Sequence, residues 1–179
     1  LLKKILLYTF PIILTGILQL LFNAADLVVV GRFGSDNSVA AVGATGAIIN
    51  LITNLFIGLS VGAGVSVAHG LGAGKGDDVH KTVHTAIPTA IISVLTVLGV
   101  CGSETFLSLM GTPSDVIGLS TTYMKIYFIG ITASMIYNFG SAILRAAGDT
   151  KSPLIYLTAA GIVNVILNLI FVILLKMDV

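Results

Sequence analysis

Three polar side chains interrupt a long apolar run that begins at Ile5, namely Gln19, Asn23 and Asp26. Their spacing of four and three residues places them on one face of a helix. A carboxylate in an apolar helix is costly when charged, and either a proton or a sodium ion relieves that cost. Asp26 is therefore the strongest candidate for a cation-coupling acid. The alternative is a structural ion pair with a cation such as Arg32.

A second polar stripe lies near the other end of the chain, where Gly161, Asn164 and Asn168 are spaced by three and four residues. The two amides do not titrate, but their carbonyl oxygens could help to ligate Na⁺ or could accept a hydrogen bond from a neutral acid. Comparable stripes run through two further apolar segments, and the candidates for the lining of a substrate cavity are Gln19, Asn23, Asn50, Asn54, Tyr123, Tyr127 and Asn138. The alternative is that these groups only hold helices together.

The composition is that of a membrane protein. The 179 residues are 56% hydrophobic and 9% charged, whereas soluble domains have about 25% charged residues. A net charge of +1 argues against a nucleic-acid partner. The single cysteine, Cys101, allows neither a disulfide nor a cysteine zinc site within the chain.

Five apolar segments follow one another between loops rich in glycine, proline and Asx residues, at residues 4–30, 40–71, 81–109, 120–144 and 153–175. Each is long enough to cross a bilayer core of about 30 Å. All five must be helical, because an open strand would leave its backbone groups unsatisfied in lipid. The expected fold is an all-α polytopic membrane protein.

The cationic residues of the loops predict the orientation. With the N-terminus in the cytoplasm, the inner side has six cations, which are Lys3, Lys4, Lys75, Lys81, Arg145 and Lys151. The outer side has two, Arg32 and Lys176. The positive-inside rule favours this arrangement in the cell membrane. Lys125 lies just inside the fourth segment and could extend to the outer interface. Five spans put the C-terminus outside, and we interpret the chain as incomplete.

Other residues admit two interpretations. Pro11 could act as a hinge in the first helix or produce a static kink. The glycines of "GLSVGAG" favour close helix packing over a nucleotide loop. The three histidines, His69, His80 and His84, are predicted to be interfacial residues and not metal ligands, since they lack a partner set suited to zinc. No Ser/His pair, paired acids or HExxH pattern supports an enzyme.

Four stretches together resemble a known family: "PIILTGILQLLFNAADLVVVGRFG", "VAAVGATGAIINLITNLFIGLSVGAGVSVAHGLGAGK", "LRAAGDTKSPLIY" and "NVILNLIFV". The sequence resembles the N-terminal lobe of a multidrug and toxic compound extrusion (MATE) transporter, including DinF-like and NorM-like bacterial members. The resemblance implies five of the six helices of one lobe, with the sixth helix and the C-terminal lobe as missing partners. It also implies a secondary antiporter that exports cationic or amphipathic drugs and metabolites in exchange for H⁺ or Na⁺, with no other cofactor.

The resemblance extends to single residues. Asp26 matches the family's acid in helix one, a proposed coupling site, and Pro11 matches a proline near which that helix is proposed to bend. Asn164 and Asn168 match a polar pair in helix five. DinF-like members commonly have Asp where this chain has Asn168, so a site with two carboxylates is not expected here.

Two other functions stay open. One is a lipid-linked oligosaccharide flippase of the same superfamily, whose cavity would need Arg and Lys residues, and only Lys125 could serve. The other is a truncated, non-transporting membrane fragment or partner protein.

Overall fold

The computed structural model describes residues 2–33, 36–91 and 94–174, and these form an all-helical protein without strands. In chain order the helices are α1 (Leu2–Phe33), α2 (Asp36–Gly72), α3 (Gly76–Ile91), α4 (Val94–Leu109), α5 (Ile117–Ala146) and α6 (Lys151–Leu169). A π-helical turn, η1 (Ile170–Leu174), continues α6. The prediction of an all-α membrane fold is confirmed.

The number of helices differs from the sequence prediction. The predicted third helix, 81–109, is described as two helices, α3 and α4, of 16 residues each. Residues 92 and 93 between them lie outside the described residues, as does residue 175 at the end of the predicted fifth helix. Neither α3 nor α4 alone reaches the roughly 20 residues that a span needs. Four other helical segments do, and they are Leu2–Phe33, Val39–Gly72, Ile117–Ala146 and Lys151–Ile173.

Helix α5 is the centre of the larger group of helices. Helices α2, α3 and α4 pack around it, and their shared core includes Phe56 of α2, Ala86 of α3, Leu107 of α4 and Phe128 of α5. Gly64 allows α2 to approach α5 closely, because an added Cβ would lie 3.1 Å from the carbonyl oxygen of Ala142. The prediction of close glycine packing therefore holds at Gly64. It does not hold at Gly58 and Gly62, where a Cβ would meet no atom within 4 Å.

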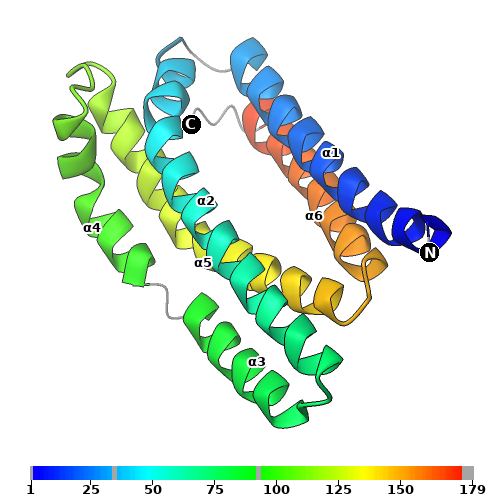
Figure 1. Ribbon diagram of the computed structural model, residues 1–179. Helices are drawn as coiled ribbons and strands as arrows, with labels where there is room; N and C mark the ends of the chain where they lie inside the picture. The colour runs from blue at the N-terminus through cyan, green and yellow to red at the C-terminus, as the bar shows by residue number, and fades with distance from the viewer. Residues whose placement is uncertain (1, 34–35, 92–93, 175–179) are drawn as a thin grey trace.

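Helices α1 and α6 form a separate pair that lies alongside α2 and α5 (Figure 1). They come together at Gly161, where the ring of Phe22 packs so closely that a Cβ would overlap it. The outward surfaces of both helices are rich in exposed apolar side chains, such as Leu20 and Ile162. Apolar surface of this extent is what a bilayer would cover.

Candidate functional site

The pairing of α1 with α6 brings two of the predicted site residues together. The side-chain amide of Asn168 donates a hydrogen bond to Oδ1 of Asp26, with an N–O distance of 2.6 Å. The two residues are 142 positions apart in the sequence, and both side chains are half-buried. The contact of Phe22 with Gly161 lies about one helical turn from Asp26 on α1 and about two turns from Asn168 on α6, so it helps to set the separation of α1 and α6 here.

This hydrogen bond is of the kind that stabilises an ionised carboxylate, because a neutral amide N–H points at the oxygen that carries the charge. A proton or a sodium ion that binds the same carboxylate would compete with that N–H. The partner of Asp26 is therefore an amide on another helix. The structural ion pair with Arg32, considered from the sequence, is not formed in the described residues, where Asp26 instead accepts a hydrogen bond from Asn168.

The other polar residues of these two helices lie outside this contact. Asn164 is one turn before Asn168 on α6 and is exposed. Gln19 and Asn23 precede Asp26 on α1 and are also exposed. Within this chain the polar face of α1 is thus open along most of its length and is closed only at Asp26.

A second polar contact joins α2 to α5. The hydroxyl groups of Thr53 and Tyr127 are 3.3 Å apart, and the rings of Tyr127 and Tyr123 have centroids 6.4 Å apart. Among the remaining cavity candidates, Asn138 is half-buried, and two are exposed on α2, which are Asn50 and Asn54.

Pro11 is buried inside α1, which continues as one helix on both sides of it. Proline has no N–H to give to the preceding turn. The hydroxyl of Thr15 donates to the carbonyl oxygen of Pro11 at 2.7 Å, which supplies a local side-chain hydrogen bond next to the gap. The role of Pro11 as a hinge stays a prediction.

The stretch "RAAGDTKSP" is the turn between α5 and α6. Gly148 takes a φ of +95°, a left-handed conformation that ends α5 and suits glycine. Oδ1 of Asp149 then accepts hydrogen bonds from the backbone N–H groups of Lys151 and Ser152, which caps the start of α6. The hydroxyl of Ser152, followed by these backbone N–H groups, holds the pKa of the Asp149 carboxyl below its usual range.

Two tyrosines secure the same turn, and the sequence analysis did not single them out for this. The hydroxyl of Tyr8 in α1 donates to the carbonyl oxygen of Arg145 at 2.7 Å. The hydroxyl of Tyr137 in α5 donates to that of Pro153 at 3.0 Å. Because each tyrosine reaches a different end of the turn, the motif joins α1, α5 and α6 at one end of the bundle. The role of this motif is therefore structural.

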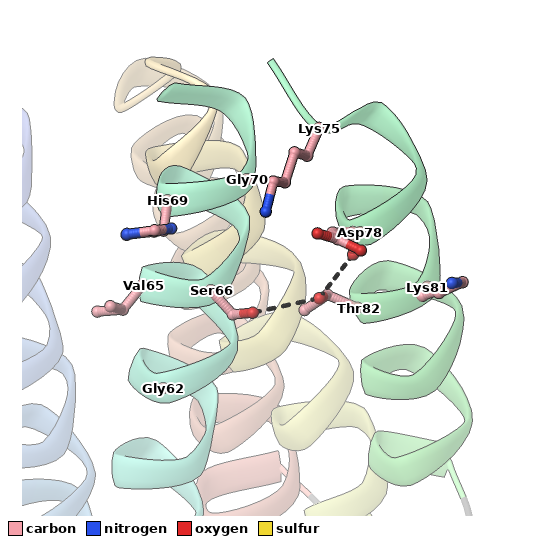
Figure 2. Close-up of a pocket in the computed structure, with 9 residues that line it drawn as sticks. All are labelled: Gly62, Val65, Ser66, His69, Gly70, Lys75, Asp78, Lys81 and Thr82. Carbon is pink, nitrogen blue, oxygen red and sulfur yellow. Dashed lines mark hydrogen bonds between the residues drawn. The ribbon is translucent and has the colours of Figure 1, made fainter. Parts of the chain in front are cut away.

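A hollow of about 570 Å³ lies elsewhere, between α2 and α3 (Figure 2). Ser66 and Thr82 meet across it at 3.2 Å, and Thr82 also donates to the backbone oxygen of Asp78. Lys75 extends into the same gap, as Figure 2 shows. None of the predicted site residues lines this hollow. We place the candidate site at Asp26, where a carboxylate of one helix accepts a hydrogen bond from a side chain of another.

The chain is similar to known transport proteins over almost all of its length. A family model described as MatE matches residues 11–170. The probable multidrug resistance protein YpnP of Bacillus subtilis (strain 168) is 32% identical over 182 residues, which cover 99% of this chain and 40% of that protein. An FAD transporter of Shewanella oneidensis is 33% identical over 78 residues, or 44% of this chain and 17% of that protein.

Solved structures show the same fold. A MATE protein in complex with MaD3S superimposes with a TM-score of 0.91 at 24% identity, over 98% of this chain and 40% of that one. A MOP superfamily transporter from Pyrococcus furiosus superimposes with a TM-score of 0.86 at 24% identity, over 97% of this chain and 38% of that one. The binding pocket of that transporter is described as having reverse polarity, which suggests a different function. The chain thus spans about 40% of the length of YpnP and of the MATE protein bound to MaD3S.

Proposed function

Because this chain belongs to the MatE family, we propose that it is the N-terminal lobe of a secondary antiporter. The antiporter would export cationic or amphipathic drugs or metabolites in exchange for H⁺ or Na⁺ across the cell's inner membrane. The hydrogen bond from Asn168 to Asp26 carries the proposal, because it joins the acid of α1 to a second helix through a contact that a cation can replace.

In the proposed cycle, Asp26 is ionised and bound to Asn168 when no coupling ion is present. A proton would neutralise the carboxylate, and a sodium ion would take its oxygens as ligands, with the carbonyl oxygens of Asn164 and Asn168 as further candidates. Protonation and sodium binding both neutralise the carboxylate charge that the Asn168 N–H stabilises. The contact between α1 and α6 would weaken or rearrange, which couples ion binding to a shift of helix α1, with Pro11 as its hinge.

The substrate surface would be the open polar face beside this pair. It presents amides from α1 and α2 and the paired tyrosines of α5. Aromatic faces attract organic cations, and an ionised Asp26 would supply a negative charge at the edge of this surface. A cavity of this kind would be completed by a second lobe, in keeping with relatives that are longer than this chain.

The experiment is efflux from proteoliposomes that hold a complete two-lobed transporter carrying this sequence. Asp26→Asn keeps the size of the side chain and removes the exchangeable charge, so we expect ion-driven efflux to be lost while the protein stays folded. Glu104→Gln is the matched control, because Glu104 is an exposed acid on α4. Unchanged efflux by Asp26→Asn would exclude Asp26 as the coupling acid.

An anionic cargo is the second candidate, and the relative described as an FAD transporter favours it. Such a cargo, or the lipid carrier of a flippase, needs a cation on the cavity surface, and Lys125 is exposed on α5. Lys125→Gln should lower transport of a flavin dinucleotide in the same proteoliposomes. If neither the wild type nor the variant transports the flavin dinucleotide, the anionic cargo is excluded and the drug antiporter remains as the proposed function.

A further inference from the structure

Two histidines on α3 lie next to each other, with their rings tilted by 39°. His80 and His84 are four residues apart, so they occupy one side of the helix. Their Nε2 atoms are 3.0 Å apart and their ring centroids 4.1 Å apart. Both side chains are exposed, whereas Ala86 and Ala90 of the same helix are buried in the core. The pair therefore stands on the open side of α3, near the end of the helix that follows the α2–α3 turn.

The separation of the two nitrogens is that of neighbouring ligands on one metal ion. With metal–nitrogen bonds of about 2.0–2.1 Å, the 3.0 Å between the Nε2 atoms corresponds to an angle of about 94° at the metal. Neighbouring ligands of a square-planar or octahedral ion subtend about 90°. A tetrahedral ion such as Zn²⁺ would need about 3.3 Å at the same bond length.

We propose that His80 and His84 form a two-histidine chelating site for Cu²⁺ or Ni²⁺. Imidazole suits both ions, and both take square-planar or tetragonal coordination. In the described residues no group of three His, Cys, Asp or Glu side chains could hold a metal, so water would complete the coordination. The formal charges next to the pair balance, with Asp77 and Asp78 in the first turn of α3 against Lys75 and Lys81, so the two imidazoles would supply the affinity.

From the sequence, these histidines are expected at the interface, because no set of zinc ligands accompanies them. A closed zinc site needs four ligands. A bidentate site needs only two nitrogens at the right separation, and this separation depends on the side-chain rotamers. The competing explanation of the 3.0 Å distance is an N–H···N hydrogen bond between two neutral rings, which needs no metal.

The test is titration of the untagged 179-residue chain in detergent micelles with Cu²⁺ and, separately, Ni²⁺. We expect one ion per chain, and an electron paramagnetic resonance spectrum of the Cu²⁺ form with coupling to two imidazole nitrogens. His84→Ala should weaken binding by about tenfold or more, since even changes outside the ligand set cost about 10–100-fold. His69→Ala is the matched control and should bind as the wild type does.

A second variant separates chelation from the mere presence of histidines. His84→Ala/Thr85→His keeps three histidines but puts the pair five residues apart, about 140° around the helix, so it should lose the two-nitrogen spectrum and the tight site. Two results would overturn the proposal. One is a wild-type chain that binds neither ion, which leaves the hydrogen bond as the explanation. The other is equal affinity in the wild type and in His84→Ala/Thr85→His.

Discussion

Replacement of Asn168 by leucine tests whether its amide governs the affinity of Asp26 for the coupling ion. Leucine fills the place of the asparagine side chain but has no N–H to donate, so the 2.6 Å hydrogen bond to Asp26 is lost. A hydrogen bond to a charged group contributes about 1.5–3 kcal/mol. Because Asp26 is only half-buried, the lower end applies, and about 1.4 kcal/mol is a factor of ten in binding. The ion-free state loses this stabilisation, so the coupling ion should bind about tenfold more tightly.

The assay is substrate efflux from proteoliposomes with a complete two-lobed transporter, measured against the concentration of H⁺ and, separately, of Na⁺. We expect the half-maximal concentration of the coupling ion to fall about tenfold in Asn168→Leu. Thr158→Val is the matched control, because it removes a half-buried polar group of α6 whose hydroxyl bonds within its own helix, to the carbonyl oxygen of Leu154. A rise of the half-maximal concentration would refute the reasoning and would indicate that the Asn168 carbonyl ligates the ion. The same shift in both variants would also refute it.

Two further predictions concern the parts that hold α1, α5 and α6 together. Gly161→Ala places a methyl group against the ring of Phe22, so we expect a loss of about 1–3 kcal/mol of stability, seen as a lower unfolding temperature in detergent. Adding Phe22→Ala to this variant should relieve the overlap. Gly58→Ala is the control and should be tolerated, because its surroundings are open. An equal loss of stability in both glycine variants would contradict the prediction. Asp149→Ala should lower the unfolding temperature at pH 7, because the pKa of Asp149 is held below its usual range in the folded chain. This contribution to stability is present above the unfolded-state pKa of about 3.9 and disappears as pH falls through the lower folded-state pKa. If the difference in unfolding temperature between wild type and variant persists unchanged at more acidic pH, the carboxylate is not its source.

Much of the fold follows from composition and periodicity. Long apolar runs with few charges must be helices in a bilayer, whatever their neighbours are. The turn between α5 and α6 was also visible, since Gly148 and Asp149 favour a helix end followed by a helix start for local reasons. The third predicted helix, 81–109, is described as α3 and α4 on either side of residues 92 and 93, which lie outside the described residues.

The sequence by itself also identified Asp26, because a carboxylate among apolar residues is costly wherever the helix lies. It did not identify the partner. Helical spacing shows which residues share a face, but it does not show which helix that face meets, and Asn168 is 142 residues away. Arg32, close in sequence, was the natural alternative. The packing of α1 along α6, which includes the close contact of Phe22 with Gly161, decides that the acid meets an amide.

The same limit explains the remaining differences. Three glycines of one motif looked equivalent, yet only Gly64 faces a neighbouring backbone closely. The i, i+4 spacing of His80 and His84 was plain, but the 3.0 Å between their nitrogens depends on rotamers that the spacing leaves free. The sequence alone thus determined the helices and the costly charge among them, because both follow from the bilayer and local chemistry. The tertiary structure decided which side chains touch, because contacts between distant segments depend on how whole helices pack.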